Sequence, residues 1–351
     1  MQIQNIKNKN ITVKKEGKVS QKTPNFKGFT EVMMDNVFLN KALFDLTGSD
    51  IPWVAMANNK DERRERINRA ALSVGMIFIS PLIILPFVNR FAMKNIVGLT
   101  SKFNSKNYNA IRLSNEYLVN KEKTMEGLQK LSKNSLSNEL QRFYYKYILK
   151  KPLPELKIDS KSLLESVNGD SELLRKKIII AKNIVLGSDF MIIMGSFGHV
   201  GFYNNRQTKN KTGQDGFAAE LKMADKEIIE KRAAEYKKNE RMRYGIFFAS
   251  LAGLVVGLPL AIKHGLSSSN NNIFKKIGKH FDYQDAIFMK RLPMALSFVG
   301  AHFGVFMASR NNTERKDNGI RSSTALSIFF LGDILLTSLL GKISDRMFGT
   351  K

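Results

Sequence analysis

Long uncharged apolar runs alternate with charged segments along this chain, and the pattern predicts helices that cross a membrane. Residues 70–88 and 244–262 contain no charged side chain, and an arginine stands just before each run. A helix needs about 20 mostly apolar residues to cross the hydrocarbon core of a bilayer. We therefore expect both runs to be membrane spans.

Three further apolar runs contain internal polar groups, and they extend the predicted bundle. These runs are residues 178–203, 282–309 and 323–341. Counted as spans, they give an all-α, multi-pass transmembrane helical bundle of about five spans. Residues 91–177 separate two of the spans and are predicted to form a helical extramembrane region.

The remaining segments are predicted from their composition and periodicity. We expect a disordered basic tail over 1–28, short amphipathic helices over 29–69, and one long helix over 217–262. The charged stretch 61–66 is interpreted as the solvated first turns of a helix, and 311–322 as a charged loop. Trp53 has two readings, a core residue or an aromatic anchor at the membrane interface.

Local spacing predicts several helix features in the region 91–177. Ser162 and Glu165 have capping-box spacing, and Asp170 or Ser171 is suited to cap the next helix. An apolar stripe recurs at helical spacing before Pro152, on a helix that is also basic. Such a helix either lies flat on an anionic membrane surface or packs within a small soluble subdomain. The stripe comprises Leu136, Leu140, Phe143, Tyr144, Tyr147 and Ile148.

A stripe of polar residues runs along the predicted span 178–203. Lys182, Asp189 and Ser196 recur every seven positions, so they share one helical face, and His199 lies within about 100° of them. Charged groups that face lipid are costly, so we expect this face to turn inward.

The stripe has two candidate partners in other spans, namely His302 and Asp333. One interpretation is a proton or ion pathway along these polar groups. The other is a set of buried polar contacts that fixes the register of the helices.

Small residues recur every four positions in two predicted spans, which lets helix backbones approach closely in lipid. The two ridges are expected either to face each other within one chain or to mediate a homodimer. The ridge residues are Ala249, Gly253 and Gly257 in the first, and Gly300, Gly304 and Ala308 in the second.

The composition limits which partners the chain can bind and which kinds of catalytic or metal site it can contain. Lysine and arginine number 56 against 31 acidic residues, a formal net charge of +25, which indicates an acidic partner. The basic residues are spread over every predicted loop, as expected beside anionic lipid headgroups, and no nucleic-acid-binding module is present. The chain has no cysteine. No motif of a known enzyme class and no metal-ligand spacing occurs, so we expect no catalysis, cofactor or metal.

These patterns lead to an expected location and role. No apolar run stands near the N-terminus, so we expect no cleavable signal peptide. We expect the chain to lie in the cell membrane because of its apolar runs. The distribution of lysine and arginine predicts a cytoplasmic N-terminus. The predicted role is structural, through a homo-oligomer or another membrane protein. The alternative is a small transporter or channel that uses the polar stripe.

Overall fold

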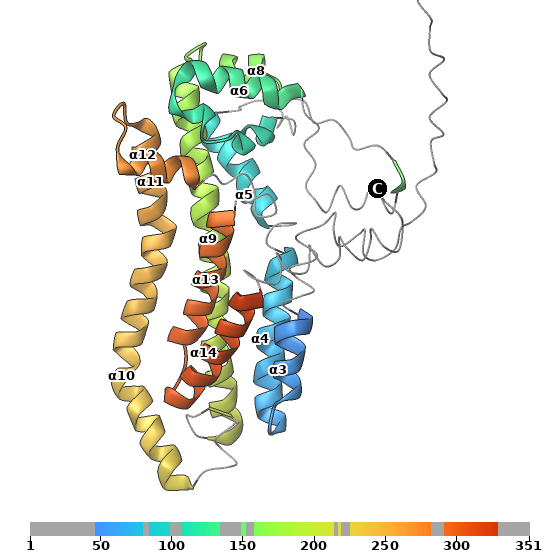
Figure 1. Ribbon diagram of the computed structural model, residues 1–351, viewed down its shortest axis with the longest axis vertical. Helices are drawn as coiled ribbons and strands as arrows, with labels where there is room; N and C mark the ends of the chain where they lie inside the picture. Colours follow the sequence, from blue (N-terminus) through green and yellow to red (C-terminus); the bar gives the residue numbers. More distant parts are fainter. Residues whose placement is uncertain are drawn as a thin grey trace, which may run out of the picture.

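The chain folds into helices packed around one long central helix (Figure 1). No strand occurs within the described ranges, so the predicted all-α class is confirmed. The computed structural model describes residues 46–79, 84–98, 107–133, 149–151, 158–213, 217–218, 225–281 and 291–328. The α-helices are α3 (Ile51–Ala55), α4 (Lys60–Ile79), α5 (Leu85–Ala92), α6 (Lys121–Lys133), α8 (Ser160–Glu165), α9 (Ser171–Thr212), α10 (Lys226–Ala252), α11 (Leu258–Ser267), α12 (Ile273–His280), α13 (Arg291–Met307) and α14 (Asn312–Ser327).

Helix α9 is the centre of the fold and contains the predicted span 178–203. The Asp170 carboxylate caps its first turn by accepting hydrogen bonds from the backbone N–H groups of Glu172 and Leu173, at 2.9 and 3.0 Å. Gly213 ends the helix in the left-handed conformation, with φ 72°, which glycine adopts at little cost. Helices α4, α5, α11 and α13 all pack against α9. The other elements are therefore held in place by this helix.

The second long helix runs beside α9 in the opposite direction (Figure 1). It begins at Lys226, later than the predicted start at residue 217, because Phe217 and Ala218 lie outside any helix. It continues through a π-helical turn, η7 (Gly253–Gly257), into α11, so that one helix spans Lys226–Ser267. Its first half is charged and its second half is apolar.

Helices α13 and α14 form an antiparallel hairpin. Residues 311–322 were expected to be a charged loop, but they begin helix α14. The Asn311 side chain accepts a hydrogen bond from the Glu314 N–H at 2.9 Å and caps that helix. The charged residues of α14 are therefore ordered on a helix, and several face inward.

Shorter elements cover the end of α9 near its N-terminus. They are α5, α6, α8, α12, the π-helical turn η3 (Met93–Val97) and the 3-10 turns η4 (Asn107–Arg112) and η5 (Tyr117–Val119). Their buried apolar residues join those of α9 in one core, which includes Leu113, Leu128, Leu163 and Leu174. Asp159 caps α8 by accepting from the Ser162 N–H, so the helix start predicted at Ser162 is wrong.

The number of membrane spans stays a prediction. Two helices in the described ranges, Ser171–Thr212 and Lys226–Ser267, are long and apolar enough to cross a membrane. The tail 1–28, the apolar stripe of residues 136–148 and Asp333, with most of 323–341, lie outside the described residues. The predicted spans 70–88 and 282–309 correspond in part to α4, α5 and α13.

Candidate functional site

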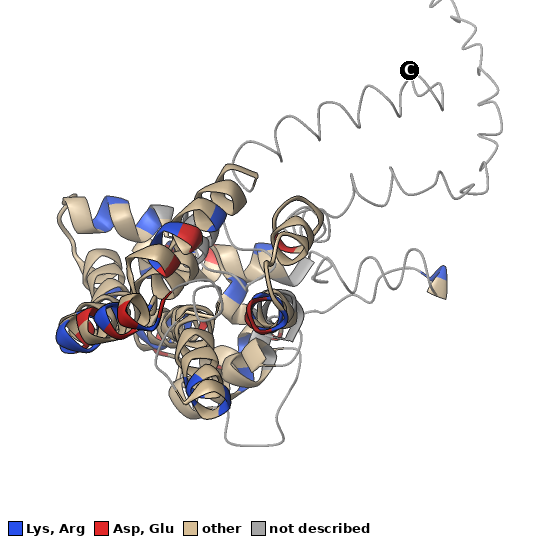
Figure 2. Ribbon diagram, turned by 90° about the horizontal axis from the view of Figure 1, so that it is seen from below, with Lys and Arg blue, Asp and Glu red and all other residues tan. Residues whose placement is uncertain are grey.

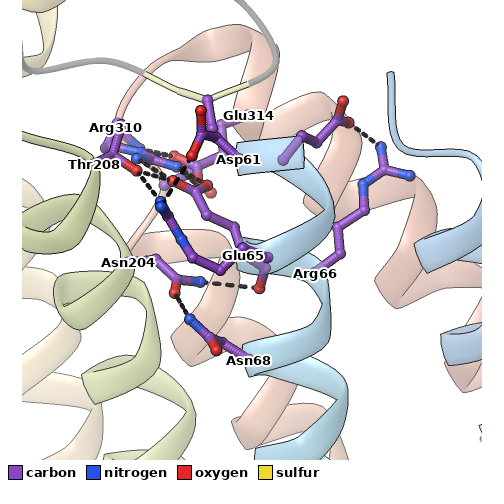
Figure 3. A network of polar contacts seen from close by, with 12 residues as sticks. Asp61, Glu65, Arg66, Asn68, Asn204, Thr208, Arg310 and Glu314 are labelled. Carbon is purple, nitrogen blue, oxygen red and sulfur yellow. Dashed lines mark hydrogen bonds and ion pairs between the residues drawn. The ribbon is translucent and has the colours of Figure 1, made fainter. Parts of the chain in front are cut away.

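A cluster of charged side chains lies where α4, the C-terminal part of α9 and the turn between α13 and α14 meet (Figure 3). Arg310 is at its centre and is 1% exposed. Its guanidinium group donates to Glu65 Oε1 at 3.0 Å and, through Nε, to Glu314 Oε2 at 2.9 Å. Charge-assisted contacts of this kind fix geometry strongly, because both guanidinium edges are used. Arg310 therefore joins α4 to α14.

A second arginine reinforces the same junction. Arg69 of α4 is 2% exposed and lies 2.5 Å from Glu314 Oε1, and it also donates to the Asn318 side chain. Asn318 in turn donates to the Ser309 hydroxyl at 2.7 Å. Glu314 thus accepts from two buried arginines that come from different segments.

Helix α9 contributes polar side chains to this cluster. Asn204 donates to the Glu65 backbone carbonyl at 3.1 Å and accepts from Asn68 at 2.9 Å. One helical turn farther along, Thr208 donates to the Glu65 carboxylate and accepts from Arg64 at 3.1 Å. The C-terminal part of the central helix is therefore bound directly to α4.

Trp53 lies beside the cluster and is enclosed by arginines. The Arg66 and Arg321 guanidinium carbons each lie 4.6 Å from the centre of its ring, a cation–π distance. Its indole N–H donates to Asp317 at 3.3 Å, and Arg66 binds the same carboxylate at 3.2 Å. Trp53 is 8% exposed, so the core reading agrees with the structure, although its neighbours are cations. Arg321 also pairs with Asp50.

Arg243 attaches the second long helix to the same end of the bundle. It stands at the boundary between the charged and apolar halves of that helix. Its guanidinium donates to the carbonyls of Ser309 and Arg310 at 2.6 and 3.1 Å, next to the C-terminus of α13. A cation is favourable there because the carbonyl groups at a helix end carry partial negative charge. Burial lowers the pKa of Arg243. We use the name arginine clamp for the ion-paired residues at this end of the bundle together with Arg243. The ion-paired residues are Asp50, Glu62, Glu65, Arg66, Arg69, Arg310, Glu314, Asp317 and Arg321.

Electrostatics in the arginine clamp favour the charged forms. Burial alone would lower the pKa of Arg310, but Glu314 and Glu65 outweigh burial and raise it. Burial alone would raise the pKa of Glu314, but Arg310 and Arg69 hold it at about 2. These groups remain ionised near neutral pH and pair with one another, so the arrangement suits a structural link better than proton transfer.

The predicted polar stripe does not form one continuous inward face. Lys182 is buried and donates to the Leu113 carbonyl, and Asp189 is fully buried. Ser196 is only partly buried, and His199 is exposed. The expectation of an inward face is thus right for Lys182 and Asp189 and wrong for His199. The reason is that the seven-residue spacing does not include His199, which lies to one side of the stripe.

His302 binds α14 and also lies beside α9. It is 4% exposed, and its Nδ1 lies 3.1 Å from the Ser322 hydroxyl of α14. Its ring centre also lies 6.3 Å from that of Phe197 on α9. His302 therefore stabilises the hairpin of α13 and α14.

One ridge of small residues forms a close helix contact, but with α9. A Cβ atom built on Gly304 would lie 3.2 Å from the Met194 carbonyl, and one built on Gly201 would lie 2.5 Å from Ala308 Cβ. The other ridge, Ala249, Gly253 and Gly257, is exposed. The alternative in which the two ridges face each other is therefore wrong, because Gly198 and Gly201 give α9 the complementary surface. The homodimer alternative stays a prediction.

The arginine clamp was not predicted from the sequence, because its charged residues were expected to be exposed to solvent. Stretch 61–66 was read as solvated helix turns, yet Glu62, Glu65, Arg66 and Arg69 are buried. Their spacing of three and four residues places them on one helical face, and that is the signal that identifies them. On α14, Glu314, Asn318 and Arg321 repeat the same spacing.

The described residues offer no other cluster with recognisable chemistry, and comparisons with known proteins add none. Within the described ranges, no group of three histidine or acidic side chains is placed to hold a metal ion. No protein-family model, no curated protein and no solved structure matches this chain.

Proposed function

We propose that this chain is an integral membrane protein with a structural or interaction role, embedded in the cell membrane with a cytoplasmic N-terminus. The observation that supports the proposal is that paired charges are buried on helices whose apolar side chains are exposed. Arg310 and Glu65 are each 1% exposed, whereas Ile67 of α4 is 48% exposed and Ile320 of α14 is 71% exposed. Lipid favours apolar groups outside and paired charges inside. Water would favour the reverse.

The second long helix supports the same proposal. Only 17% of its most apolar 18-residue window is buried, against 56% for the corresponding window of α9. Phe248, Val256 and Leu260 are each more than half exposed on that helix. The core helix of a soluble protein is covered by neighbours, so lipid is the simplest cover for such a surface.

The way in which the arginine clamp is built supports the structural role. Its ion pairs and hydrogen bonds join α3, α4, α9, α10 and the hairpin of α13 and α14 at one end of the bundle. Acidic and basic positions both occur on the charged helices seen in the end view of Figure 2. A clamp of mutually paired charges fixes helix positions and leaves the charged half of α10 exposed for a partner. We infer that assembly, with a second copy or another membrane protein, is the role.

The alternative function is a small transporter or channel, and Asp189 is the observation that favours it. A fully buried carboxylate in an apolar helix is typical of ion pathways. Replacement of Asp189 and Asp333 by asparagine separates the two functions. Loss of an ion flux with normal insertion supports transport, whereas loss of folding or assembly alone supports the structural role.

Membrane integration is tested by extraction of the full-length chain from membranes. High salt should not release it, because salt weakens phosphate contacts but not buried apolar helices. Alkaline carbonate should also leave it in the membrane fraction. Release by salt would instead indicate a peripheral basic protein that binds nucleic acid or headgroups. A reporter fused after Gly213 gives the side on which α9 ends.

A further inference from the structure

An open groove of about 290 Å³ runs between α9 and the helix formed by η7 and α11. Its walls are mainly apolar, and Met191, Val256 and Leu260 line it while staying 61%, 53% and 57% exposed. The groove forms where the two helices touch. A Cβ atom built on Gly187 would lie only 2.5 Å from the Val255 carbonyl oxygen. The two backbones thus approach closely and form the floor of a shallow channel.

Polar groups gather at one end of this groove. Asn183 and Lys263 line it together with Ile180. The chain directions place them on the side of the groove nearer the N-terminus of α9, because α11 runs antiparallel to α9. Lys263 is exposed and directly follows the uncharged run 244–262. The groove therefore has a cationic, polar end, and the remainder of its lining is apolar except for Ser188.

Asn183 is a polar residue of this end of the groove whose side chain is not fully hydrogen-bonded. The residue is 9% exposed, and its amide nitrogen is buried and makes no hydrogen bond to any described residue. Because that nitrogen has no accessible surface, a ligand in the open groove contacts the rest of the Asn183 side chain and not this donor. The exposed ammonium group of Lys263 at the same end of the groove favours an anionic group there.

The length of the groove matches one leaflet. From Ile180 to Met191 the α9 wall rises roughly 16 Å, at 1.5 Å per residue. Half of a hydrocarbon core that is about 30 Å thick is about the same length. A lipid with its phosphate or ester oxygens at Asn183 and Lys263 would therefore extend its acyl chain along the apolar part.

We propose that this groove binds one anionic phospholipid, with its headgroup at Asn183 and Lys263 and an acyl chain along Gly187, Met191 and Val256. This assignment rests on the proposed membrane location of the chain. The bound lipid would cover exposed apolar surface of both long helices.

Titration of the purified full-length chain in detergent tests the proposal, with bound lipid counted by native mass spectrometry. Dioleoyl phosphatidylglycerol should bind with one tight site, and dioleoyl phosphatidylcholine more weakly. Lys263→Gln should weaken phosphatidylglycerol binding roughly tenfold, the loss expected for one charge-assisted contact. Val256→Trp, which fills the groove at an exposed position, should displace the lipid. Lys237→Gln and Ile246→Trp, on the same long helix but outside the groove, should leave binding unchanged.

Several results would overturn the lipid site. Equal weakening by Lys237→Gln would show a diffuse charge effect, and unchanged binding in both groove variants would show that the lipid sits elsewhere. Displacement of the lipid by inorganic phosphate at similar concentration would assign the polar end to a free anion. Release of the chain by carbonate would overturn both proposals, whereas failure in the titration alone overturns only the lipid site.

Discussion

Arg310 and Glu65 lie 245 positions apart in the sequence, yet Arg310 Nη1 is 3.0 Å from Glu65 Oε1 in a site from which water is excluded. This contact closes the chain on itself, because it joins the first long described helix to the last described hairpin. Removal of either partner leaves an uncompensated buried charge, which generally costs more than the pair contributes.

Arg310→Met should destabilise the protein by about 3–5 kcal/mol, since Glu65 and Glu314 would both lose their central partner. Thermal or denaturant unfolding of the purified chain in detergent measures the change. Arg63→Met is the matched control, because Arg63 lies on α4 and is exposed. The double variant with Glu65→Gln should lose less stability than the sum of the single variants. Strict additivity would mean that the two residues do not interact.

Stability should fall in acid through Glu314. The pKa of this carboxyl is lowered in the folded protein, from 4.5 to about 2, mainly by Arg310 and Arg69 acting against burial. Its contribution is therefore complete above pH 4.5 and is lost as the pH falls toward 2. Thermal unfolding midpoints measured across this window should decline in the native chain and decline less in Glu314→Gln. Equal slopes in both proteins would remove Glu314 from the explanation.

The contact between Gly201 and Ala308 has room for one Cβ methyl group, on either residue, but not for two. Gly201→Ala would place two methyl carbons 2.5 Å apart and should cost about 1–3 kcal/mol. Adding Ala308→Gly should restore most of the stability, because the remaining contacts at Gly201 are 3.7 Å or longer. Gly195→Ala is the control on the same helix, since nothing described lies within 4 Å of its added Cβ. A rescue that fails would refute this geometry.

Trp53 fluorescence should report on the arginine clamp, because it is the only tryptophan in the chain. Trp53 is 8% exposed, and the guanidinium carbons of Arg66 and Arg321 lie 4.6 Å from the centre of its ring, so a soluble quencher should reach it poorly. Quenching should increase in Arg310→Met well below the unfolding temperature if the clamp loosens as a unit. Exposed-site variants such as Lys237→Gln should leave it unchanged. Strong quenching in the native chain would contradict the burial.

The sequence predicted the helices better than it predicted their contacts. The apolar run 178–203 and the Asp170 cap identify α9, because both signals are local. The pairing of Arg310 with Glu65 depends on the folded chain. The consecutive charged residues of the 61–66 stretch resemble a solvent-exposed segment. Charge spacing on α4 places Glu62, Glu65 and Arg69 on one face, but no local rule says that this face turns inward.

The same limit applies to the residues chosen as a candidate site. Lys182 and Asp189 were expected to face inward because a charge on the lipid-facing side of an apolar helix is costly. That argument requires only the sequence of the helix itself. The partner of Lys182 is a backbone carbonyl at Leu113, which no side-chain pattern reveals. The ridge of Gly300, Gly304 and Ala308 was identified by spacing, whereas its partner required the position of α9.

Labelling of a cysteine introduced in the middle of the second long helix tests membrane integration most directly. The chain has no cysteine, so Ala252→Cys and Lys237→Cys each give a single reactive site on exposed positions of one helix. The membranes are opened so that an impermeant maleimide reaches both faces. The account predicts labelling of Lys237→Cys in the membrane, and labelling of Ala252→Cys only after detergent is added. Equal labelling of both variants before detergent is added would contradict it.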